Sequence, residues 1–152
     1  MREIKFRGKC VPDSKYAGQW VTSGYVAPDA DCKKRDEGLI VKYLGGNTTI
    51  TYHVDPATVG QYTCLKDKNG KEIYEGDVLK SHFSLEPFGI VTWHDNGYFF
   101  VDTSFGEWRS LDYACIPLGD LMGKQIDDER VQIEVIGNIH DNPELLKEDE
   151  SK

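Results

Sequence analysis

Residues 88–103 read FGIVTWHDNGYFFVDT, and this stretch decides the fold class. Asn96-Gly97 favours a tight turn, because both residues tolerate positive φ angles. The β-branched and aromatic residues on either side favour extended strands. The stretch therefore predicts a β-hairpin with a two-residue turn, in which Phe99 lies opposite His94.

Short alternating segments broken by turn residues run through the rest of the chain. Asp55-Pro56 and Asn142-Pro143 each place a capping side chain before a proline, and this arrangement predicts a short helical turn. Strands are predicted for residues 4–7, 19–26, 39–44, 48–54, 77–82, 88–94, 98–103 and 131–136. The predicted fold class is therefore mainly β, with short helical turns.

A polar turn around Asn69-Gly70 lies near the middle of the chain and marks a possible boundary. We expect an N-terminal β unit at residues 1–72, a second β unit at 73–147 and an acidic tail at 148–152. One intertwined domain is the alternative, since 152 residues suit either one ordinary domain or two very small ones.

Composition and charge bound the function classes. The 26 acidic and 18 basic side chains give a formal net charge of −8, which disfavours nucleic acid and anionic membrane surfaces as partners. No apolar leader or membrane-spanning apolar run occurs, so we expect a cytoplasmic protein with reduced thiols. The cysteines are far apart and form no C-x-x-C pair, so we expect no metal site; they are Cys10, Cys32, Cys64 and Cys115.

The sequence displays no recognisable catalytic motif. It lacks a G-x-S-x-G elbow, a phosphate-binding loop and a calcium loop. The histidines are dispersed, with none at a spacing that would bring two together on one strand face or helix turn; they are His53, His82, His94 and His140. We therefore expect no catalytic residue, no cofactor and no enzymatic activity.

Basic residues form a candidate stripe. Lys5, Arg7 and Lys9 alternate along one predicted strand and would share one face. Residues 33–35 form a second basic cluster, KKR. Such a stripe either contacts phosphates, as on small barrels that bind single strands, or is simply a solvated outer face.

The hairpin carries large apolar side chains on both predicted faces. A two-residue turn places one set together: Val91, Trp93, Tyr98 and Phe100. The opposite set is Thr92, His94, Phe99 and Val101. A small barrel buries only one face, so the other is covered by the N-terminal half, by another subunit or by a foreign partner. The candidate interaction surface, extended by two later aromatics, is Trp93, Tyr98, Phe100, Phe105 and Trp108.

Three stretches resemble the YopX family of phage and prophage proteins. The first is REIKFRGK at residues 2–9, and the second is VDPATVGQYT at 54–63, which runs into LKDKNGKEIYEGDV at 65–78. The third is IEVIGNI at 133–139, followed by Asn142-Pro143-Glu144-Leu145-Leu146. The chain departs from the family pattern at Cys64, where glycine is common, and at His140-Asp141, where an aromatic and an acid are common.

This resemblance implies a mostly β fold whose C-terminal half is similar to an SH3-like small barrel. It also implies a phage or prophage origin and hence a bacterial cytoplasm. The family has no assigned activity and no established catalytic residues, so no site residue is carried over. The central motif is interpreted as architecture, because its glycines suit tight turns that fix strand register.

The function expected from these observations is a non-enzymatic binding or assembly module. Its partner would be a host or phage protein, and the chain itself is expected to form a homo-oligomer. The alternative is a nucleic-acid-binding small barrel, which would use Lys5, Arg7 and Lys9. No cofactor and no membrane are expected.

Overall fold

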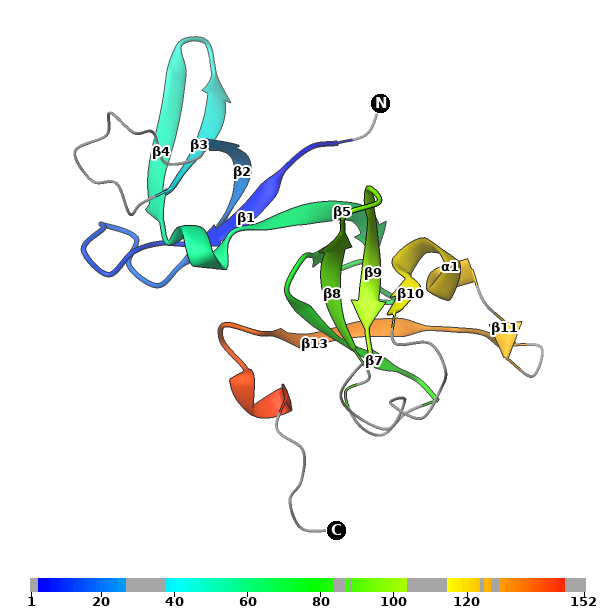
Figure 1. Cartoon of the computed structure of the whole chain (residues 1–152). Helices are drawn as coiled ribbons and strands as arrows, with labels where there is room; N and C mark the ends of the chain where they lie inside the picture. Colours follow the sequence, from blue (N-terminus) through cyan, green and yellow to red (C-terminus); the bar gives the residue numbers. More distant parts are fainter. Residues whose placement is uncertain are drawn as a thin grey trace. The chain divides into compact units, whose positions relative to one another are not determined.

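The computed structural model describes residues 3–26, 38–83, 87, 89–103, 115–123, 125–126 and 129–146 (Figure 1). The fold is mainly β, as the sequence predicts, with two antiparallel sheets of six and five strands and little helix. The chain divides into two compact units, Met1–Tyr62 and Thr63–Lys152. The sequence-based boundary at 72/73 therefore lies ten residues beyond the observed division, and the tail at 148–152 lies outside the described residues.

The first unit is built on most of the six-stranded sheet, whose order is β4-β3-β2-β1-β5-β6. The strands are β1 (Phe6–Lys9), β2 (Trp20–Val26), β3 (Gly38–Gly45), β4 (Thr48–Val54), β5 (Gly60–Lys66) and β6 (Glu72–Tyr74). Strand β5 crosses the division, because Gly60–Tyr62 belong to the first unit and Thr63–Lys66 to the second. The core of the first unit is small and consists of Cys10, Ile40 and Val54, with Tyr16, Val21, Tyr52 and Val59 packed against it.

The predicted helical turn after Asp55 is confirmed as the 3₁₀ turn η1 (Pro56–Thr58). The Asp55 carboxylate accepts a hydrogen bond from the Ala57 N–H at 2.9 Å, and Pro56 stands at the first helical position. The cap works because the first turn of a helix has N–H groups with no partner inside the helix. The turn places the chain at the start of β5.

The second unit is built on the five-stranded sheet, whose order is β10-β9-β8-β7-β13. Its strands are β7 (Asp77–Ser81), β8 (Gly89–His94), β9 (Tyr98–Asp102), β10 (Cys115–Pro117) and β13 (Ile133–Asn138). A short helix, a two-stranded ribbon and a 3₁₀ turn accompany the sheet: α1 (Leu118–Gly123), β11 (Gln125–Ile126) with β12 (Glu129–Arg130), and η3 (Pro143–Leu146). The core lies on one face of the sheet and consists of Ile73, Leu79, Val91, Phe99, Val101, Leu118, Leu121, Val131, Ile133 and Val135.

The SH3-like barrel implied by the resemblance is not confirmed. A barrel requires the first and last strands of the sheet to pair, and closure abolishes the sheet edges. Among the described residues, β10 and β13 stand at opposite ends of the five-stranded sheet and do not pair with each other. The second unit is therefore an open antiparallel sheet in its described part.

A buried carboxylate fixes the central turn of the chain. Asp67 is 7% exposed, and one of its oxygens accepts hydrogen bonds from the N–H groups of Asn69 at 2.8 Å and Lys71 at 2.9 Å. The other oxygen accepts from the Val135 N–H on β13 at 3.1 Å. Burial raises the pKa of this carboxyl group, but these backbone bonds and the Lys71 charge outweigh it and hold the pKa below its usual range.

A second buried carboxylate orders the next turn of the same motif. Asp77 is fully buried and accepts a hydrogen bond from the Tyr74 N–H at 2.8 Å. Between them, Gly76 has a φ angle of +82°, which side chains disfavour. Residues 65–78 therefore form turns and strands in the described structure, and Asp67, Gly76 and Asp77 stabilise the turns.

Candidate interaction surface

The β8–β9 hairpin is present, but its predicted register is wrong by one residue. Trp93 lies opposite Phe99 and His94 lies opposite Tyr98, so the connection has three residues rather than two. Gly97 alone in this connection takes a positive φ angle, +90°, and its N–H donates to the His94 carbonyl at 2.8 Å. A two-residue type I′ turn would need positive φ at Asn96 as well, whereas a three-residue loop needs it only at the last position.

The corrected register rearranges the faces of the hairpin. Phe99 is buried on the core side, beside Val91 and Val101. Trp93 lies on the same face, edge to face with Phe99 at a ring-centroid distance of 4.9 Å. Trp93 is 38% exposed because it stands near the end of the hairpin, at the margin of the core.

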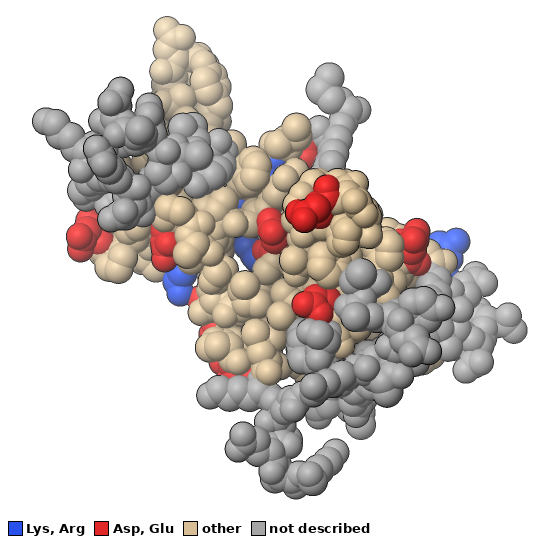
Figure 2. Space-filling view, viewed as in Figure 1, with Lys and Arg blue, Asp and Glu red and all other residues tan. Residues whose placement is uncertain are grey.

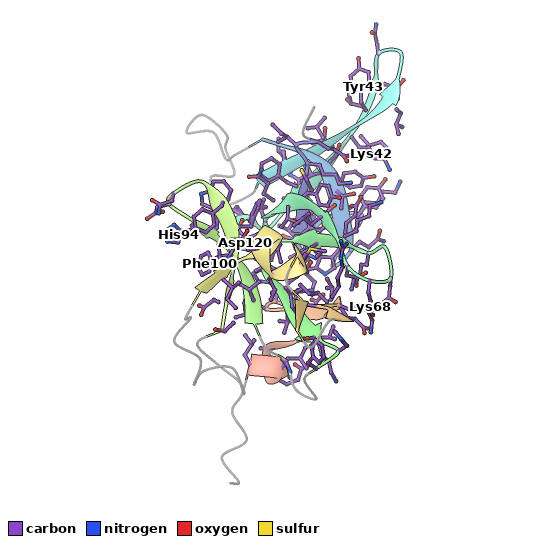
Figure 3. The ribbon with its side chains drawn as sticks, turned by 90° about the vertical axis from the view of Figure 1, so that its right-hand side faces the viewer. Lys42, Tyr43, Lys68, His94, Phe100 and Asp120 are labelled. Atoms are coloured by element: carbon purple, nitrogen blue, oxygen red, sulfur yellow. The ribbon has the colours of Figure 1, made fainter. Side chains whose placement is uncertain are left out.

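Three aromatic rings gather on the other face and form what we name the outer aromatic cluster: His94, Tyr98 and Phe100. The rings of His94 and Tyr98 are stacked, with centroids 4.8 Å apart and planes 6° apart. Phe100 meets the His94 ring edge to face at 5.5 Å. All three side chains are half-buried, and Figure 3 shows His94 and Phe100 projecting on the same side of the ribbon.

The predicted interaction surface is therefore divided. Tyr98 and Phe100 stay together, but Trp93 lies on the opposite face. His94 joins the cluster, although the sequence placed it with the opposite set. Phe105 and Trp108 lie outside the described residues. The signal that was missed is the length of the connection, because counting Asp95 as part of the loop restores the observed faces.

The surroundings of the outer aromatic cluster are acidic. Asp95 is exposed in the hairpin connection, and Asp102 lies two residues beyond Phe100 on the same face of β9. Residues 89–103 contain no Lys or Arg. Figure 2 shows acidic side chains over this hairpin. The cluster thus combines aromatic area with negative charge.

Comparison with known protein families gives one decisive result. The sequence model of the family described as "YopX protein" matches residues 5–147, nearly the whole chain. The chain belongs to the YopX family. A comparison with curated protein sequences gives no match.

Three solved chains match this YopX-family chain, and among them is "Crystal structure of protein EF1440 from Enterococcus faecalis". The two share 22% sequence identity with a TM-score of 0.51, over 97% of this chain and 100% of that one. At this identity the likeness concerns the fold alone. It supports the arrangement of strands and says nothing of a ligand or partner.

In the basic stripe of this YopX-family chain, Lys5 and Arg7 contact other side chains of the same chain. Lys5 pairs with the Glu3 carboxylate at 3.3 Å and lies 4.5 Å from the centre of the Tyr62 ring. Arg7 lies 4.8 Å from the centre of the Trp20 ring. Lys9 is half-buried, as are Lys5 and Arg7. The basic cluster at 33–35 lies outside the described residues.

The remaining candidate features of this YopX-family chain are its possible metal ligands, its Cys10 hollow and its helices. No group of three or more His, Cys, Asp or Glu among the described residues is placed to hold a metal ion. Cys10 lines a hollow of about 450 Å³ beside Lys9 and Asp55. Burial raises the pKa of the Cys10 thiol, against an opposing hydrogen bond with Ser14, so the unreactive thiol form is favoured. No described helix has the length and apolar character that crossing a membrane would require.

Proposed function

We propose that the chain is a non-enzymatic binding or assembly module that docks a protein partner on the outer aromatic cluster. The observation that carries this proposal is the set of half-buried rings on the face of the β8–β9 hairpin opposite the core, His94, Tyr98 and Phe100. Tyrosine and phenylalanine are enriched in protein interfaces, since their rings bury much area at little entropic cost. We place this activity in the cytoplasm of a bacterium that carries the phage or prophage.

The charge around the cluster favours a protein over a nucleic acid. Single-stranded nucleic acid binds where aromatic stacking is combined with cations that follow the phosphates. The cluster offers the rings, but residues 89–103 carry Asp95 and Asp102 and no Lys or Arg. The cations of the alternative, Lys5 and Arg7, contact aromatic rings of their own chain. A nucleic-acid-binding function would have to displace these contacts.

The geometry of His94 supports binding rather than proton transfer. Its ring stacks on Tyr98, and its Nδ1 lies 3.1 Å from the Asn96 N–H, which donates to it. A general base must reach a proton on a substrate, with a partner that tunes its protonation. His94 has aromatic and backbone partners instead, which orient the ring as part of a contact surface.

The test is affinity purification of the tagged full chain from a bacterial lysate, with and without nuclease, at low and high salt. We expect a stoichiometric protein partner that persists after nuclease and at high salt, because aromatic burial is little affected by screening. The double variant Tyr98→Ser/Phe100→Ser should lose it. The matched control Phe83→Ser, at an exposed aromatic outside the cluster, should keep it.

Nucleic acid that is recovered with the wild type, with every protein partner lost on nuclease treatment, would contradict the proposal and favour the alternative. Circular dichroism of each variant checks that the fold is retained. Equal loss of the partner by the double variant and by the Phe83→Ser control would also contradict the proposal, because the cluster would then have no special role.

A further inference from the structure

Strand β4 stands at the end of the six-stranded sheet, and part of its outer edge has no partner among the described residues. Near its C-terminal end the edge is covered: the Val11 N–H donates to the His53 carbonyl at 3.1 Å, and the Asp55 N–H donates to the Lys9 carbonyl at 2.9 Å. In an antiparallel strand, the N–H and C=O of one residue point to the same side, and successive residues alternate. Thr51 and Thr49 therefore present their backbone groups outward, as His53 does.

No described residue bonds these outward groups of Thr49 and Thr51. The strand also lacks the features that usually protect a sheet edge, namely charged side chains, proline and a covering segment, within its described surroundings. An exposed, uncharged edge with high strand propensity is a template for pairing with another strand. The outward backbone groups of Thr49 and Thr51 therefore suit a β-strand as the partner of this edge.

The β3–β4 hairpin extends beyond its neighbour in the sheet (Figure 1). Strand β2 pairs with β3 only as far as Val41, so the remainder of β3 has β4 as its partner and no core beneath it. Two large apolar side chains there face solvent, Tyr43 at 67% and Leu44 at 53% exposure. Figure 3 shows Tyr43 near the end of this hairpin.

Charge decides which strand can approach. The chain carries a net charge of −8, so two copies repel each other over most of their surface. Residues 38–54 contain no Asp or Glu, and Lys42 is their only Lys or Arg. An uncharged edge flanked by a cation on an acidic protein is where a second copy meets the least repulsion.

We propose that two copies of the chain pair antiparallel through β4, forming one sheet continuous across both. The segment Thr49-Ile50-Thr51 reads the same in both directions. Centring the pair on Ile50 places Thr49 of each copy opposite Thr51 of the other, so that the outward groups of both threonines are bonded. A pair centred on Thr51 would instead direct Thr49 at His53, whose carbonyl already accepts from Val11.

This interface is separate from the outer aromatic cluster, so either proposal can fail alone. The first test is sedimentation equilibrium of the full chain over a range of concentrations. We expect the mass to rise from 17.2 kDa toward twice that value. The dimer fraction should grow with added salt, because salt screens the repulsion between two acidic chains while hydrogen bonds and apolar contacts persist. A wild type that stays monomeric at all concentrations would overturn the proposal.

The variant Thr51→Pro removes one outward N–H without removing a bond to β3, and proline is tolerated on an open edge. We expect it to remain monomeric at concentrations where the wild type is a dimer. The matched control Thr51→Val keeps the N–H and the strand propensity, so it should dimerise like the wild type. Dimerisation that both variants retain, or both lose, would overturn the assignment of the interface to the backbone edge.

The second test does not depend on how well the proline variant folds. In the proposed register, Ile50 meets its own counterpart in a non-hydrogen-bonded pair, where Cα atoms lie about 4.5 Å apart, within disulfide range. Ile50→Cys should therefore form a disulfide-linked dimer on mild oxidation, above the background of the wild-type cysteines. The control Lys42→Cys, one strand back from the edge, should not. The reverse pattern, or no difference between them, would overturn the register.

Discussion

The β8–β9 and β3–β4 hairpins are both antiparallel and rich in aromatic and β-branched residues, yet they have opposite environments. The first lies between β7 and β10 and rests one face on the core through Val91, Phe99 and Val101. In the second, β4 is the only described strand beside the outer part of β3, and Tyr43 and Leu44 are exposed. The difference shows that similar strand-forming sequences can present different features. A hairpin packed on a core presents the side chains of its other face, whereas a hairpin without a core beneath it presents the backbone groups of its edge strand.

The largest expected difference between the two hairpins is in the free energy of unfolding after a substitution in the core. Phe99→Ala removes a buried ring and should lower the free energy of unfolding by about 3–5 kcal/mol. Leu44→Ala in the other hairpin should change it by no more than about 0.5 kcal/mol, because the side chain is already exposed. Urea denaturation followed by circular dichroism measures both. Similar losses for the two variants would mean that the β3–β4 hairpin has a core of its own.

The Asp67 carboxylate stabilises the second unit, which contains the β8–β9 hairpin, by accepting a hydrogen bond from the Val135 N–H on β13. The described residues of the β3–β4 hairpin include no buried carboxylate of this kind. Asp67→Asn should lower the free energy of unfolding by about 1–3 kcal/mol at neutral pH, since a buried N–H loses a charged acceptor. The control is Asp95→Asn in the exposed hairpin connection.

The pH dependence of this effect has a defined sign. The folded-state pKa of Asp67 lies below its usual value, so its contribution is complete above the unfolded-state pKa and is lost as the pH falls through the folded-state pKa. The difference in unfolding free energy between wild type and Asp67→Asn should therefore shrink as the pH is lowered through the acid range. A difference that stays constant down to the lowest accessible pH would contradict the role of the ionised carboxylate.

The two hairpin turns give a smaller and sharper comparison. Gly97 and Gly46 both have positive φ angles, +90° and +59°, so an alanine at either position is strained by about 1–2 kcal/mol. Gly97→Ala should lower the global stability, because its turn closes a hairpin held in the core. Gly46→Ala should instead lower the hydrogen-exchange protection of β3 and β4 beyond Val41 and leave the global unfolding free energy nearly unchanged. Equal global losses would contradict the difference between the hairpins.

The smallest effect concerns the strand shared by the two units. Cys64 on β5 has a φ angle of +67°, the only positive value outside glycine among the described residues. Cys64→Gly should raise the free energy of unfolding by up to about 1 kcal/mol, because glycine adopts this angle without strain. Cys64→Ala keeps a Cβ and should show no such gain. A loss on Cys64→Gly would mean that the thiol contributes packing worth more than the strain.

The sequence predicted the local features of this chain well. The mainly β class, the β8–β9 hairpin and the cap at Asp55 were predicted because each depends on residues a few positions apart. The hairpin register was not, because it depends on whether Asn96 adopts a positive φ angle, which the dipeptide Asn-Gly permits but does not require.

Features that depend on distant residues were also missed. Barrel closure requires two edge strands to meet, and no local pattern reports that pairing. The rings that contact the basic stripe belong to Trp20 and Tyr62, which the strands bring beside Arg7 and Lys5 from elsewhere in the sequence. The contact between His94 and Tyr98 could be predicted only with the correct register of the β8–β9 hairpin. Only the tertiary structure supplies these relations.

The passage of β5 from one unit to the other has a consequence for inheritance. Gene exchange that joins halves of different proteins succeeds most readily where few contacts cross the junction. In this chain the junction at Tyr62/Thr63 falls inside a strand, whose first residues pair with β1 while Thr63 donates its hydroxyl to the Ile73 carbonyl at 2.8 Å. A recombinant that replaces one half would have to bring a strand suited to both neighbours. We therefore expect the two units to be inherited together and seldom to be separated by recombination.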